Sequence, residues 1–182
     1  MLTKTGILAA IAAGDIAINP FDEKQLNPNS YDLRLAPEYA VYEKRDSGGL
    51  IDAAKDNPII RKRIGEEGLV LEPGELYLMA TQEYTYSRCF VPGLEGRSSL
   101  GRLGVSVHAT AGFGDVGFKG TWTLEVSVIR PVRIYRNMRF CQLFFEECSG
   151  PVNLDIDSYT GKYNGQVSPK PSQIFKERNE WN

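Results

Sequence analysis

With 182 residues, 42% of them hydrophobic, the chain is long enough for one domain with its own core. Its 21 basic and 23 acidic residues give a formal net charge of −2, which predicts neither a nucleic-acid partner nor a membrane partner but leaves room for a small anion. Three scattered cysteines favour a reducing, cytoplasmic setting over a disulfide framework. The single histidine, without CxxC, HxxxH or HxE spacing, gives no zinc signature.

The first predicted element is an amphipathic helix at the N-terminus. Leu2, Ile7, Leu8 and Ile11 have helical spacing, and Gly14 is a typical C-terminal stop. The apolar run at 6–13 has an alternative interpretation as the core of a secretory signal peptide, although it is too short to span a membrane.

Short strands separated by turn residues follow along the chain, a pattern typical of a sandwich or a barrel. The segment 43–68 is polar and predicts a surface excursion, a second short helix is expected to begin near Ser98, and the tail after Gly150 is expected to have little regular structure. The expected strands are 15–18, 31–35, 69–72, 76–81, 105–109, 121–129, 132–135 and 140–146.

Residues 96–102 place two arginines and two serines around the expected start of the second helix. Ser98 or Ser99 can cap that helix, and the N–H groups of its first turn attract anions. The planar fork of arginine suits phosphate oxygens. The alternative is a capped helix in which Arg97 and Arg102 form structural ion pairs.

The segment 109–120 contains four glycines around Asp115, which indicates a backbone that turns sharply or lies close to a ligand. The alternative is a glycine-rich hairpin with the aspartate in an Asx-turn. Glu125 follows in an apolar strand, where a buried carboxylate must be paired, hydrogen-bonded or protonated. Burial often raises the pKa of such a group, which suits proton transfer, and an ion pair with Arg102 is the alternative.

Six motifs in this order resemble the dCTP deaminase family, which shares its fold with trimeric dUTPases. The resemblance is weakest over 43–68, and an ordered set of motifs is more specific than any single one. It implies a mainly β, dUTPase-like distorted barrel or jelly roll with short helices, forming a homotrimer. One domain would span 1–182, with 151–182 as a tail that closes over the nucleotide. The motifs are PNSYDLRL at 28–35, LEPGE at 71–75, GRSSLGRLG at 96–104, TAGFGDVG at 110–117, TLE at 123–125 and KYNGQ at 162–166.

The resemblance implies hydrolytic deamination of dCTP without zinc, a reaction of pyrimidine deoxynucleotide metabolism. Glu125 matches the catalytic glutamate, Ser98 and Arg102 match residues that hold the attacking water and the glutamate, and the carbonyl of Ala111 would position water. Magnesium is implied as an ion held through the triphosphate rather than by a protein cage. The nucleotide-binding residues implied are Arg97, Ser99, Gly112, Asp115, Phe118, Thr123, Gln142, Tyr159, Lys162, Tyr163 and Gln166.

Gly112 separates two kinds of family member. Members that release dUTP commonly have histidine at this position, whereas members that also cleave dUTP to dUMP and pyrophosphate have glycine. The segment 141–143, CQL, resembles the GQL of the second kind, in which Asp115 positions the hydrolytic water. Gly114 departs from the usual Ile or Val and predicts a looser loop. We favour the bifunctional hypothesis, with a dUTP-releasing deaminase as the alternative.

His108 matches a family histidine near a site where dTTP inhibits, which makes it a regulatory candidate. The alternative is a histidine with satisfied hydrogen bonds at a subunit contact. Two rival functions remain. A dUTPase alone has no use for Glu125 beside the base, and a non-catalytic nucleotide-binding protein of the same fold would bind without turnover.

Overall fold

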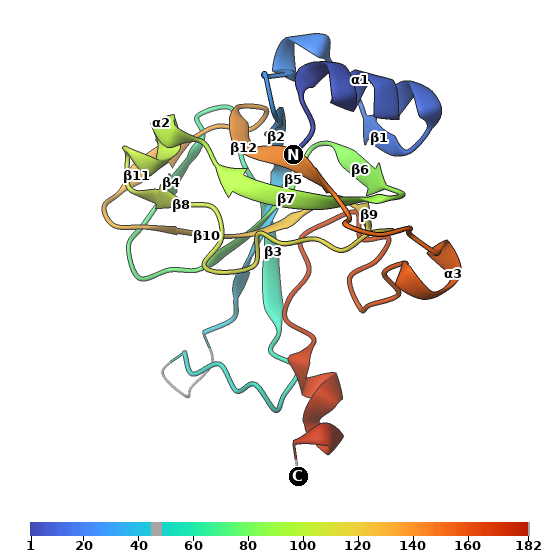
Figure 1. Ribbon diagram of the computed structural model, residues 1–182. Helices are drawn as coiled ribbons and strands as arrows, with labels where there is room; N and C mark the ends of the chain where they lie inside the picture. Colours follow the sequence, from blue (N-terminus) through green and yellow to red (C-terminus); the bar gives the residue numbers. More distant parts are fainter. Residues whose placement is uncertain (45–48, 182) are drawn as a thin grey trace.

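The computed structural model describes residues 1–44 and 49–181 and is mainly β, as predicted (Figure 1). The helical elements are α1 (Lys4–Ala13), α2 (Ser98–Gly101), α3 (Leu154–Asp157) and the 3-10 turns η1 (Glu23–Gln25) and η2 (Ile174–Glu180). The strands are β1 (Ile16–Asn19), β2 (Tyr31–Tyr42), β3 (Ile59–Arg63), β4 (Leu69–Leu71), β5 (Tyr77–Thr81), β6 (Tyr84–Ser87), β7 (Phe90–Gly96), β8 (Val105–Ser106), β9 (Lys119–Gly120), β10 (Thr123–Val128), β11 (Val132–Ile134) and β12 (Arg139–Glu147).

Within the described residues the strands form three sheets. The largest has the order β7-β12-β2-β5-β10-β8, with β3 added to β2. The second has the order β1-β6-β9, and the third pairs β11 with β4. Side chains from all three sheets meet in one hydrophobic cluster, which agrees with the expected barrel-like architecture.

Strand β10 illustrates how alternation positions a functional side chain. It pairs with β5 on one side and β8 on the other, and Glu125 lies opposite Leu78. Leu124 and Val126 are fully buried in the core, because successive side chains of a strand point to opposite faces. The face that carries Thr123 and Glu125 is only partly covered, so both side chains remain available to a ligand.

The N-terminal helix is confirmed. The Thr3 hydroxyl accepts from the N–H of Gly6, and Gly14 ends the helix in the left-handed region at φ 78°. Ile7 is fully buried in the common core, so this apolar run is part of the folded domain. Among the described residues no helix has the length and apolar character needed to cross a bilayer.

Four strands escape prediction from the sequence: β3, β6, β7 and the two-residue β9. Pro92 and Gly93 lie inside β7, and both residue types weaken a strand signal. The strand tolerates them because it is the edge of the large sheet and hydrogen-bonds only β12 along that path. Strand β3 lies in the segment 43–68, which was expected to be only a surface excursion, and residues 45–48 of that segment fall outside the described part of the chain.

Candidate functional site

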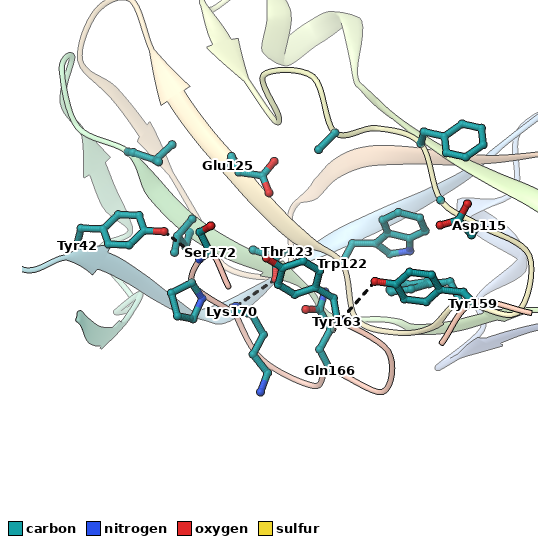
Figure 2. A pocket seen from close by; sticks show the side chains of 17 residues that line it. Tyr42, Asp115, Trp122, Thr123, Glu125, Tyr159, Tyr163, Gln166, Lys170 and Ser172 are labelled. Carbon is teal, nitrogen blue, oxygen red and sulfur yellow. Dashed lines mark hydrogen bonds between the residues drawn. The ribbon is translucent and has the colours of Figure 1, made fainter. Parts of the chain in front are cut away.

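A cavity of about 480 Å³ opens between the exposed face of β10, the loop before β9 and the C-terminal tail. Figure 2 shows its lining, with Glu125 and Asp115 at separate parts of the pocket. Eight residues predicted from the sequence line it: Ala111, Asp115, Phe118, Thr123, Glu125, Tyr159, Tyr163 and Gln166.

Glu125 projects from β10 into this cavity and is partly buried (Figure 2). Burial raises the pKa of its carboxyl group, whereas its own backbone N–H and the charge of His108 lower that pKa to a smaller extent. Among the described residues Glu125 and Arg102 form no ion pair, so the ion-pair alternative is wrong within one chain. A carboxyl group whose pKa lies above the usual range can both accept and return a proton.

Aromatic rings form one wall of the cavity. The ring centroids of Phe118 and Trp122 are 4.7 Å apart, and those of Phe118 and Tyr159 are 6.0 Å apart. The indole Nε1 of Trp122 donates to the Thr85 hydroxyl at 3.0 Å, which fixes the ring's orientation. Such an apolar wall with a few polar groups is typical of a site for a ring-containing small molecule.

Gly112 lies where no side chain fits. A Cβ atom there would come within 2.5 Å of the Leu94 carbonyl oxygen and 2.8 Å of the His108 Nε2. The Gly112 carbonyl accepts from the N–H of Leu94 at 2.7 Å, so the loop is drawn against β7. His108 Nε2 is 3.0 Å from the Leu94 carbonyl oxygen, which leaves His108 partly buried behind the loop rather than in the cavity lining.

The looser loop that Gly114 predicts is not what the structure contains. The N–H of Gly114 donates to the Pro92 carbonyl at 2.9 Å, and Phe113 makes an antiparallel bridge with Gly93. Asp115 follows directly and is exposed at the cavity. The glycine therefore sits in a tightly packed position, and the loop continues the large sheet beyond the edge of β7.

The C-terminal tail closes the remaining side of the cavity. Gln166 is buried, and its side-chain amide donates to the Thr121 carbonyl at 2.8 Å while the N–H of Thr121 donates to the Gln166 carbonyl at 2.9 Å. Further along, the N–H of Lys170 donates to the Thr123 hydroxyl at 3.2 Å. Two phenolic oxygens hold the next residues: Tyr42 accepts from Ser172 at 3.1 Å and Tyr163 accepts from Gln173 at 3.0 Å.

Other predicted residues lie outside the cavity of their own chain. Arg97, rather than a serine, occupies the N-cap position of α2 and makes no side-chain cap, so the predicted serine cap is wrong. Arg97 instead reaches the buried carboxylate of Asp32 at 3.4 Å. Ser98, Ser99 and Arg102 are exposed, Gln142 donates to the Ser30 hydroxyl at 3.2 Å, and Lys162 pairs with Glu177.

Sequence reasoning missed several lining residues, notably Tyr42, Trp122, Lys170 and Ser172. Trp122 had a usable signal, because a bulky aromatic residue precedes the Thr-Leu-Glu strand directly after a glycine-rich loop. Tyr42 and the tail residues Lys170 and Ser172 had no such signal in the sequence. They meet only because the tail runs back past the end of β2.

A metal site held by the protein alone needs several ligand side chains close together. Among the described residues no three His, Cys, Asp or Glu side chains gather closely enough to hold a metal ion.

Comparisons with known proteins agree with this architecture. The model of the family described as dCTP deaminase-like matches residues 1–148. The chain is 48% identical over 178 residues to a Leptospira biflexa protein named dCTP deaminase, dUMP-forming, covering 97% of both chains. A Clostridium acetobutylicum protein of the same name is 49% identical over 164 residues, with 90% of both chains covered.

A solved structure shares the fold. The crystal structure of 2'-deoxycytidine 5'-triphosphate deaminase from Agrobacterium tumefaciens aligns with a TM-score of 0.62 and 24% identity. The alignment covers 85% of this chain and 50% of that one, so this chain spans about half the length of the Agrobacterium protein.

Proposed function

Because the chain belongs to the dCTP deaminase-like family, we propose that it deaminates dCTP hydrolytically and then cleaves the resulting dUTP, giving dUMP, ammonia and pyrophosphate. The observation that carries the proposal is Glu125, a partly buried carboxyl group with a raised pKa in a cavity with an aromatic wall. The names of the relatives, dUMP-forming, favour the two-step reaction over release of dUTP.

In the first step, Glu125 takes a proton from a water molecule whose oxygen bonds to C4 of cytosine. Glu125 passes that proton to the ring nitrogen N3, then moves the proton of the new C4 hydroxyl to the exocyclic amino group. The bond from C4 to this amino nitrogen breaks, ammonia leaves, and the C4 carbonyl of uracil forms. The desolvated carboxyl group of Glu125 holds its proton up to a higher pH than an exposed one, which suits a group that shuttles protons. The Ala111 carbonyl, also at the cavity, would orient the water.

In the second step, a second water attacks the α-phosphorus, the bond to the bridging oxygen of the β-phosphate breaks, and pyrophosphate leaves. Asp115 would orient this water, and its exposed position apart from Glu125 suits a reaction at the phosphate end of the nucleotide (Figure 2). Glycine at position 112 agrees with this assignment, and the Leu94 carbonyl oxygen of β7 and His108 leave no room for a larger side chain there. Release of dUTP without the second step is the alternative.

Several parts of the site would come from outside one pocket. Ser98, Ser99 and Arg102 are exposed and lie apart from the cavity of their own chain, which supports a homotrimer in which Arg97 and these three serve a neighbouring subunit. Magnesium would neutralise the triphosphate, bound mainly by phosphate oxygens and water. Phe118 would support the sugar, and Tyr159, Lys162, Tyr163 and Gln166 in the tail 151–182 would cover the nucleotide. Thr123 and Gln142 would complete the binding set.

Two expectations about regulation and setting belong to the same proposal. His108 lies directly behind Gly112, so dTTP binding near His108 would change the position of the loop that carries Asp115. The three cysteines are free thiols, which supports a cytoplasmic setting.

The test is a product assay with dCTP and magnesium. We expect ammonia, pyrophosphate and dUMP in equal amounts, whereas accumulation of dUTP without pyrophosphate rejects the second step. Glu125→Gln should bind dCTP yet release ammonia about 100- to 10,000-fold more slowly, because it cannot shuttle protons. Glu95→Gln, an exposed position on β7, is the matched control. Undiminished ammonia release by Glu125→Gln would overturn the proposal, and a parent protein that binds dCTP without turnover would support a non-catalytic role.

A further inference from the structure

The loop that carries Asp115 is interlocked with the sheet through Gly114 and Trp122. A Cβ atom on Gly114 would lie 2.4 Å from Cη2 of Trp122 and 3.0 Å from the Pro92 carbonyl oxygen. Gly114 is not among the glycines with positive φ. The position therefore excludes a side chain because the indole ring fills the room, and not because the backbone is strained.

The indole is itself held in place. Trp122 is 6% exposed, its Nε1 donates to the Thr85 hydroxyl, and its backbone N–H donates to the Thr81 hydroxyl at 2.9 Å. The Phe118 ring packs against it, with the two ring centroids 4.7 Å apart. An indole fixed by hydrogen bonds and packing cannot yield to a new atom at Gly114 without losing some of these contacts.

A displacement of Gly114 is passed on to Asp115. The N–H of Gly114 is tied to Pro92, and the carbonyl of Asp115 accepts from the N–H of Phe118 at 3.2 Å. The backbone of Asp115 is therefore held on both sides, by the hydrogen bond of Gly114 before it and by that of Phe118 after it. Gly114 also lies against the indole. Glu125 depends much less on this contact, because it lies opposite Leu78 in the ladder of β10 with β5, and β8 pairs with β10 at Ser127 and Val128.

We propose that Trp122 is a positioning residue for Asp115: its indole fills the space beside Gly114 and so sets where the aspartate stands in the cavity. The inference rests on the proposed function, in which Asp115 serves the second reaction and Glu125 the first. A change at the interlock should therefore reduce dUMP formation more than it reduces ammonia release.

The test uses a double-mutant cycle on the full-length protein with dCTP and magnesium. Gly114→Ala adds one methyl group against Cη2 of Trp122, and the ratio of dUMP to dUTP should fall about 10- to 100-fold, since an error near 1 Å in placing a reacting group has costs of this size. Trp122→Phe removes Cη2, so the combination Trp122→Phe with Gly114→Ala should regain much of the ratio. Gly150→Ala, where a Cβ meets nothing within 4 Å, is the control and should keep the parent ratio.

The outcomes separate the interlock from general destabilisation. Recovery in the double variant supports the inference, because two merely destabilising changes would add. An unchanged ratio in Gly114→Ala, or a double variant no better than Gly114→Ala, overturns it. Should Gly114→Ala fail to fold, Trp122→Phe carries the test alone through the same ratio. A parent that releases only dUTP overturns the second reaction of the proposed function, and this inference with it, before any variant is compared.

Discussion

The two acidic groups of the cavity stand on differently built parts of the molecule. Glu125 lies on β10, which has hydrogen-bonded strands on both sides, whereas Asp115 lies on a loop joined to the edge of β7 by a few backbone contacts. The sheet holds Glu125 in a fixed, partly buried position. Because of this burial, the pKa of its carboxyl group is raised. The loop leaves Asp115 exposed, and its contribution depends on where its neighbours hold it.

This contrast suggests a division between the two proposed reactions. A proton shuttle needs a raised pKa, and the partly buried face of a strand raises it by desolvation. A group that orients water toward a phosphate needs a defined position above all, and backbone contacts with the sheet and the tail hold the loop of Asp115 in place. Changes in the loop should therefore alter the products, whereas changes on β10 should alter the overall rate.

The largest effect on the products is expected from Asp115→Asn. We expect dUMP formation to fall about 100-fold, because the neutral amide orients water poorly, while ammonia release falls far less and dUTP accumulates. Product analysis of a dCTP incubation measures this, with Asp56→Asn, an exposed aspartate outside the cavity lining, as the control. If dUMP stayed the sole product, Asp115 would have no special role in the second step.

Tyr163→Phe tests the tail, which covers both parts of the cavity. The variant loses the oxygen that accepts from the N–H of Gln173, a bond of ordinary net strength, so KM for dCTP should rise about 2- to 10-fold. The ratio of dUMP to dUTP should hardly move, because the tail serves both reactions together. Tyr135→Phe, on an exposed residue, is the control, and a changed ratio would place Tyr163 with the loop instead.

For Glu125→Gln we also predict a smaller effect, on the stability of the folded protein. Since burial raises the pKa of Glu125, the folded protein binds this proton more tightly than the unfolded chain, and ionisation as the pH rises through the raised pKa costs stability. At pH 7 to 8 the variant should unfold at the same or a higher temperature than the parent. The difference should vanish as the pH falls toward the ordinary value of 4.5. Thermal unfolding across pH measures it, and a clearly lower unfolding temperature at pH 8, not seen in Glu95→Gln, would contradict the assigned burial cost.

Local patterns were enough to predict much of the fold. Helical spacing and Gly14 defined the first helix, and the apolar run at 121–129 predicted the strand that carries Glu125. Both signals work because the hydrophobic pattern of a short segment indicates which element it forms. Strand β7 was missed because Pro92 and Gly93 have low strand propensity. Its pairing with β12 stabilises the strand in spite of these two residues.

The site was predictable only in part, for a related reason. Five predicted residues within 111–125 do line one cavity, namely Ala111, Asp115, Phe118, Thr123 and Glu125. The sequence did not indicate that Trp122 takes the space beside Gly114. Nor did it indicate that Tyr42, at the far end of β2, would meet the tail at Ser172. Such contacts join residues through the tertiary path of the chain, and a list of motifs carries no information about that path.

The backbone contacts of the loop also protect the molecule. A strand at the border of a sheet offers unpaired N–H and C=O groups to other chains, and here the N–H of Leu94 and the C=O of Pro92 are occupied by Gly112 and Gly114. Any variant that releases the loop of Asp115 from β7 would also expose unpaired backbone groups at the edge of the sheet. Solubility and catalytic turnover are thus tied to the same few peptide groups, and a search for faster variants in this loop should meet aggregation early.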